Sequence, residues 1–103
     1  MAQDHPIATE VIFEDDHVRV WNQVIEAGAT LPRHEHKHDY YLVTVEGGGP
    51  IDVQFHNGTG GSLGDRFEFT AARGEATFIP KGHVETATNK GSTYRAILVE
   101  LKK

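Results

Sequence analysis

Apolar and polar residues alternate in short runs along this chain, and a turn signal follows almost every run. The alternation in Ile51-Asp52-Val53-Gln54-Phe55 is typical of a strand with one buried face. No long stretch keeps the helical period of apolar positions. The pattern therefore predicts short strands at residues 11–13, 17–25, 40–45, 51–55, 66–70, 76–80 and 94–101.

Segments rich in glycine, asparagine and acidic residues separate the predicted strands. The pair Asn57-Gly58 is typical of a hairpin turn. Further turns are predicted at 14–16, 27–29, 47–50 and 89–91. About eight or nine short strands joined in this way favour an antiparallel sandwich or barrel. We expect an all-β fold with little or no helix.

Length and composition narrow the class of protein. The chain has 103 residues, enough for one domain over residues 1–103. It has no cysteine, which excludes disulfides and thiolate metal sites. A net charge of −5 disfavours nucleic acid or an anionic membrane surface as the main partner. The polar N-terminus lacks the pattern of a signal peptide, and no apolar run approaches the ~20 residues of a bilayer span. We therefore expect a cytoplasmic protein.

Histidine is the residue type that points to chemistry. Three of the seven histidines lie in His34-Glu35-His36-Lys37-His38. Residues two apart on a strand face the same way, so His34 and His36 can point together into a barrel. Two neutral imidazoles can hold a divalent ion at about 2.0–2.1 Å. The alternative is a pair of exposed histidines in a charged segment at a sheet edge.

Two spaced motifs resemble those of the cupin superfamily. The first is Gly28, five residues, His34, one, His36, three, Tyr40, six, Gly47. The second is Gly74, five residues, Pro80, one, Gly82, two, Glu85, three, Asn89. The chain departs from the family at two ligand positions. Tyr40 stands where the first motif usually has glutamate, and Glu85 stands where the second has its ligand histidine.

The resemblance implies a double-stranded β-helix, in which two antiparallel sheets roll into a small barrel that is open at one end. It also implies a metal inside the barrel near the open end. Many members are dimers that exchange or pack their N-terminal strands, so we expect a homodimer. Trp21, placed by alternation on the outward face of strand 17–25, supports a covered surface there.

The resemblance implies a ligand set of His34, His36 and Glu85. Two histidines and one carboxylate suit Fe²⁺ and leave coordination positions open; Mn²⁺, Ni²⁺ and Zn²⁺ are the other first-row candidates. A solvated surface carboxylate remains the alternative for Glu85. His38 has the strand parity of the two ligand histidines and is a further nitrogen candidate. Tyr40, His38 and His83 are the candidates for hydrogen bonding or proton transfer.

Two main functions follow from this resemblance. The first is a metal-dependent enzyme, a dioxygenase-like oxidoreductase acting on a small organic substrate inside the barrel. An isomerase or lyase would use the same metal as a Lewis acid. The second is a non-catalytic cupin that binds a small ligand or acts as a sensor and has lost the usual metal site. A third reading is a stable barrel whose histidines bind metal adventitiously.

Overall fold

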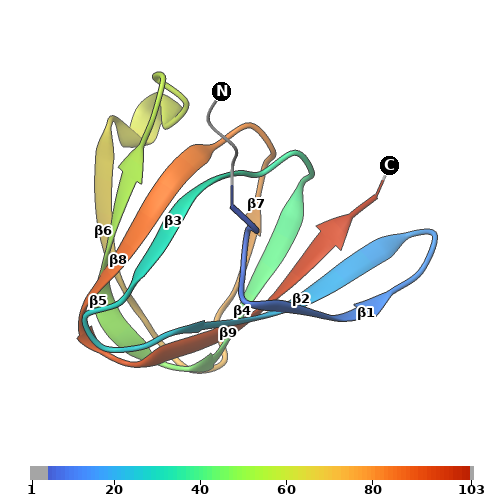
Figure 1. Ribbon diagram of the computed structural model, residues 1–103, viewed down its shortest axis with the longest axis horizontal. Helices are drawn as coiled ribbons and strands as arrows, with labels where there is room; N and C mark the ends of the chain where they lie inside the picture. The colour runs from blue at the N-terminus through green and yellow to red at the C-terminus, as the bar shows by residue number, and fades with distance from the viewer. Residues whose placement is uncertain (1–4, 103) are drawn as a thin grey trace.

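The computed structural model describes residues 5–102, which form two antiparallel sheets that face each other (Figure 1). The first sheet contains, from edge to edge, β1 (Glu10–Glu14), β2 (Val18–Ile25), β9 (Tyr94–Leu101), β4 (Tyr40–Glu46) and β7 (Ala76–Ile79). The second contains β3 (Thr30–Glu35), β8 (Val84–Ser92), β5 (Gly48–Phe55) and β6 (Arg66–Ala71). One short 3₁₀ turn, η1 (Gly61–Leu63), precedes β6. The predicted all-β class is confirmed, as is the double-stranded β-helix.

The core lies between the two sheets and is built by alternating residues. In β9, Tyr94, Ala96 and Leu98 are buried and the residues between them are only partly covered. In β5, Ile51 and Val53 follow the same alternation from the opposite sheet. Burial of one face of each strand provides the main driving force for closing the barrel.

The turn predicted at 89–91 is wrong, because these residues lie inside β8. Asn89 is fully buried, and its side-chain amide donates to the carbonyl oxygens of Ile25 at 2.7 Å and Ser92 at 2.6 Å. A Cβ at Gly91 would lie 2.0 Å from a carbonyl oxygen of β5. Asn89 and Gly91 are of residue types that are common in turns. Here they allow β8 to lie close to β2 and β5.

The placement of Trp21 on an outward face is also wrong. Trp21 packs against the core cluster, and its indole Nε1 donates to Glu100 Oε1 at 2.6 Å. Alternation along β2 is ambiguous because both of its faces carry apolar and polar residues. Trp21 therefore gives no support for a partner surface.

The β1–β2 hairpin projects away from the barrel (Figure 1). Every residue of β1 is exposed, including Val11, Ile12 and Phe13. Among residues 5–102, β1 is an edge strand of its sheet, and no other described strand pairs with its outer backbone groups. Within residues 5–102, no helix has the length and apolar character needed to cross a membrane.

Candidate metal centre

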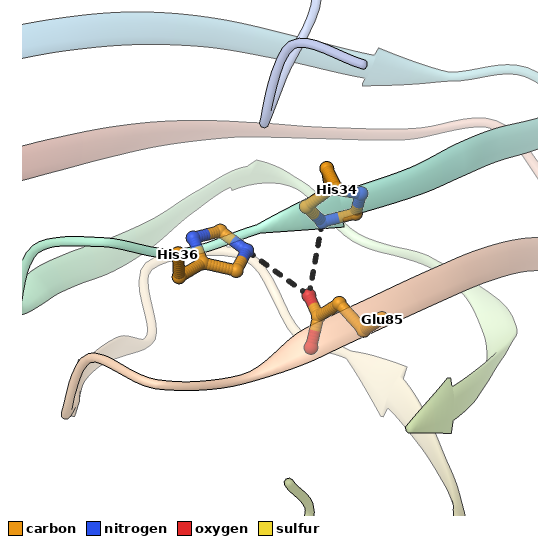
Figure 2. Close-up of side chains that lie close together, drawn as sticks. All are labelled: His34, His36 and Glu85. Atoms are coloured by element: carbon orange, nitrogen blue, oxygen red, sulfur yellow. Dashed lines mark hydrogen bonds and ion pairs between the residues drawn. The ribbon is translucent and has the colours of Figure 1, made fainter. Parts of the chain in front are cut away.

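The pairing of β3 with β8 places His34 directly opposite Glu85. His36 lies just after β3, yet its backbone continues the ladder. Its N–H donates to the carbonyl of His83 at 2.9 Å, and its carbonyl accepts from the N–H of Gly82 at 2.8 Å. This continuation keeps the period of two, so both imidazoles point at the same carboxylate (Figure 2).

The three side chains meet at one oxygen atom. Glu85 Oε1 lies 3.3 Å from His34 Nε2 and 3.1 Å from His36 Nε2. One ligand atom from each of the three residues lies within 4.8 Å of the others. Ligands held at about 2.1 Å on one ion stand about 3.0 Å apart in octahedral and 3.4 Å apart in tetrahedral geometry. The two nitrogen-to-oxygen distances therefore fit a first-row divalent ion.

The low exposure of these side chains excludes the two alternatives in which the histidines, or Glu85, lie on the protein surface. His34 and His36 are each 1% exposed, so they are not edge-strand surface residues. The Glu85 side chain is 13% exposed and is not a solvated surface carboxylate. Buried charged groups need a partner of opposite charge or a metal.

The hydrogen bond at the far side of His34 fixes its tautomer. Its Nδ1 lies 2.8 Å from the carbonyl oxygen of Pro32, which can only accept, so Nδ1 carries the proton. In the neutral ring, Nε2 then presents a lone pair to Glu85 Oε1, and two acceptors face each other. A cation is required at this point, either a proton on the ring or a metal ion between ring and carboxylate.

His36 is oriented by ring packing. Its ring stacks on Tyr40 with a centroid distance of 4.4 Å and an interplanar angle of 18°. It meets the edge of His34 at 4.9 Å and 80°. Its buried Nδ1 has no hydrogen-bond partner among the described residues. The stacked tyrosine therefore holds the ring in place, as a hydrogen bond to Nδ1 does in many metal sites.

The ionisation of the site follows from its contacts. Burial raises the pKa of Glu85, but when a proton occupies the ring nitrogens that face it, the hydrogen bonds from His34 and His36 outweigh burial and bring the pKa to about 2. Burial raises the pKa of Tyr40 well above its ordinary value, and the charge of Glu85 adds to the rise. The carboxylate is charged and the Tyr40 hydroxyl is protonated at neutral pH.

The remaining candidates separate into two groups. Tyr40 and His83 line a cavity of about 340 Å³ between the sheets, together with His36 and Glu85. His83 is held there by an edge-to-face contact with Phe55 at 4.9 Å. His38 is not brought to the cluster, because β3 ends at Glu35 and strand parity does not continue as far as residue 38.

His38 instead lines a smaller cavity of about 230 Å³, beside a second buried carboxylate. Glu100 is 3% exposed and accepts the indole hydrogen bond of Trp21 described above. Arg19 Nη1 lies 3.7 Å from Glu100 Oε1. Glu100 is therefore satisfied by an indole and a guanidinium of the protein itself.

The walls of the larger cavity were not identified from the sequence. They include Phe67 and Phe69 of β6 and Leu63 of η1. The alternation Arg66-Phe67-Glu68-Phe69 already places the two phenylalanines on one face, which was the available signal. It does not show whether that face meets a packed core or an open cavity.

No protein-family model and no curated protein sequence matches the chain. Solved structures do match it. A cupin domain from Bordetella pertussis superimposes with a TM-score of 0.78 at 20% identity, over 100% of this chain and 99% of that one. An RmlC-like cupin from Methanocaldococcus jannaschii gives a TM-score of 0.66 at 14% identity, over 89% and 76%. The polyketide cyclase RemF from Streptomyces resistomycificus gives 0.61 at 18%, over 86% and 57%. The chain therefore has the fold of a small cupin, the double-stranded β-helix.

Proposed function

We propose that this protein is a metal-dependent enzyme that holds one divalent first-row ion through His34, His36 and Glu85. Fe²⁺ is the first candidate, and Mn²⁺, Ni²⁺ and Zn²⁺ follow. The observation that carries the proposal is the contact between His34 Nε2 and Glu85 Oε1 at 3.3 Å, where the tautomer of His34 calls for a cation.

The substrate is a small organic molecule bound in the adjoining cavity, and the proposed reaction class is a dioxygenase-like oxidation. When bound, a metal with two histidines and one carboxylate supplies open positions for oxygen or substrate. Tyr40 donates a hydrogen bond from its protonated hydroxyl to a substrate oxygen. His83, on the cavity wall, takes up or releases a proton. RemF, which is named as a polyketide cyclase, is an example of an enzyme with this fold.

A second candidate is a non-catalytic protein that binds a small ligand. Tyr40 favours it, because a ring stacked on His36 takes the position where the resemblance expects a fourth ligand. Metal-loaded protein supplied with oxygen and a panel of small aromatic compounds separates the two. Oxygen uptake with a new product by mass spectrometry supports the enzyme, and binding without turnover supports the second candidate.

Metal analysis tests the site itself. We expect untagged protein, loaded with Fe²⁺ without oxygen and then desalted, to retain about one ion per chain. The double variant His34→Ala/His36→Ala should retain almost none. His38→Ala is the matched control, because His38 lies outside the cluster, and it should bind as the wild type does. Wild-type protein that holds no stoichiometric metal under these conditions overturns the proposal.

We further propose a homodimer formed through β1. The supporting observation is an edge strand that exposes Val11, Ile12 and Phe13 together. Light scattering should give twice the chain mass of 11.4 kDa for the wild type. Ile12→Lys/Phe13→Lys should give the monomer, whereas Tyr41→Lys, at an exposed aromatic on β4, should stay dimeric. A monomeric wild type at micromolar concentration would contradict this assignment.

A further inference from the structure

We infer that the cavity beside His36 and Glu85 selects ligands with a neutral, aromatic body of about two rings, with one oxygen substituent at the histidine end. The inference rests on the proposed function, whose substrate class it names. It is carried by the composition of the cavity wall, by its volume and by the placement of its polar groups.

The charge of the wall is the first observation. None of the described residues that line the cavity is lysine or arginine. The one carboxylate on the wall is Glu85, and its charge is already shared by two histidines. A carboxylate or phosphate placed away from the metal end would be buried without a partner, which is strongly unfavourable. The wall therefore rejects a second charged group on the ligand.

The second observation is the aromatic lining. Phe67 and Phe69 lie side by side on β6 with ring centroids 6.1 Å apart and an interplanar angle of 24°. Phe69 meets the edge of Tyr94 at 6.1 Å and 85°. These rings offer both a face and an edge to a flat ligand, the two arrangements that aromatic pairs prefer. A sugar-like ligand would find few of the hydrogen bonds that its hydroxyls need.

The volume sets the size of the ligand. The cavity measures about 340 Å³. A cavity of about 150 Å³ holds one benzene, so the space here is suited to about two rings. Leu63, Phe67 and Phe78 line the cavity and yet are 41%, 39% and 50% exposed, so they mark where it opens to solvent. Apolar side chains exposed at the rim of a cavity are typical of ligand entry.

The polar groups give the orientation. Tyr40, His36 and Glu85 gather at the end where the rings of Tyr40 and His36 stack, whereas Leu63 and Phe67 lie at the rim. A hydroxyl or carbonyl on the ligand accordingly faces Tyr40, and the body of the ligand extends toward β6. The other polar side chains among the described residues of the wall are Gln23, Thr77, His83 and Tyr94, and none of them is a carboxylate, a lysine or an arginine.

Binding of three probes tests the selectivity in metal-free and in Zn²⁺-loaded protein. The probes are 2-naphthol, 6-hydroxy-2-naphthoate, which adds a carboxylate at the far end of the same rings, and D-xylose as a neutral sugar. We expect 2-naphthol to bind at least about 30-fold more tightly than 6-hydroxy-2-naphthoate, and D-xylose to bind too weakly to detect. Equal binding of the two naphthalenes, or no binding of 2-naphthol in either form, overturns the inference.

Two variants keep the test independent of folding and of the metal. Leu63→Arg places a cation at the exposed rim. It should reduce the ratio of the affinity for 2-naphthol to that for 6-hydroxy-2-naphthoate by about tenfold or more. Phe67→Ala should weaken the binding of both naphthalene probes about three- to tenfold, whereas Thr70→Ala, at an exposed position of β6 outside the cavity wall, should change neither. If 2-naphthol binds selectively but no metal is retained, the proposed function fails and the inference stands. If metal is retained without this selectivity, the inference fails alone.

Discussion

Two largely covered carboxylates on opposite sheets of this barrel, Glu85 and Glu100, have partners of different kinds. Glu85 on β8 lies across from His34, and Glu100 on β9 lies across from Tyr40. Glu100 accepts the indole N–H of Trp21 at 2.6 Å. An indole nitrogen can only donate, so this contact is complete in the protein alone.

Glu85 faces two imidazoles, each of which can present either a proton or a lone pair. At His34 the choice is already made, because the Pro32 carbonyl accepts a hydrogen bond from Nδ1–H and Nε2 is left with the lone pair. The comparison teaches that burial of a carboxylate does not by itself indicate a metal site. What distinguishes Glu85 is that its neighbours leave an acceptor facing an acceptor, and a cation resolves that conflict.

The largest expected difference between the two carboxylates is in metal affinity. Glu85→Gln removes the anionic ligand and should weaken binding of Zn²⁺ or Fe²⁺ by about 100-fold or more, whereas Glu100→Gln should change it less than about threefold. Metal at 100 times its dissociation constant adds about 2.7 kcal/mol of stability. We therefore expect the Tm of the wild type and of Glu100→Gln to rise by about 10 °C or more on loading.

Calorimetric titration and thermal melts on the same three proteins check this prediction. The Tm of Glu85→Gln should remain unchanged at the metal concentration that stabilises the wild type. If Glu100→Gln loses as much affinity as Glu85→Gln, the two carboxylates do not differ in the way proposed.

In metal-free protein the order of the two variants should reverse. Glu100→Gln replaces a charge-assisted hydrogen bond from Trp21 by a neutral one and should cost about 1 kcal/mol. In Glu85→Gln, the new amide N–H can donate to the His34 Nε2 lone pair, so the metal-free variant should be at least as stable as the wild type. Urea unfolding in the presence of a chelator measures both. A clear loss of stability in metal-free Glu85→Gln would show that His34 already carries a proton on both nitrogens.

Much of the site could be predicted because its residues occupy fixed positions in spaced motifs. The spacing of His34, His36 and Glu85 named the three side chains that the structure brings within 4.8 Å. Clean alternation also located strands such as β5 and β9, where one face is buried. Local pattern was sufficient wherever a strand has one apolar and one polar face.

The errors arose where distant contacts decide the structure. The amide of Asn89 in β8 donates to the carbonyl oxygen of Ile25, far away in the sequence on β2, and no local pattern reports that contact. Trp21 faces inward because Glu100, far along the sequence, accepts its N–H. His38 leaves the site because the pairing with the neighbouring strand continues through His36 and the chain then bends at residue 38. The tautomer of His34 depends on a backbone carbonyl, which has no signature in the sequence at all.

The smallest expected effect concerns Arg19, whose guanidinium lies beside Glu100 and also forms an ion pair with Glu14. Hydrogen bonds from Arg19 and then Lys102 lower the pKa of Glu14 from 4.5 to about 2. Because the folded pKa is the lower one, this contribution to stability is present above pH 4.5 and is lost as the pH falls toward 2. Glu14 is on the surface, so solvent screening keeps the effect on stability small.

An NMR titration of the Glu14 carboxyl should show its pKa rising toward 4.5 in Arg19→Gln, with metal affinity unchanged. Lys90→Gln, which removes an ion pair with Glu68, is the control and should leave the pKa of Glu14 where it was. A pKa near 4.5 for Glu14 in the wild type would show that Arg19 does not bind Glu14. The contact of Arg19 with Glu100 would then be in doubt as well.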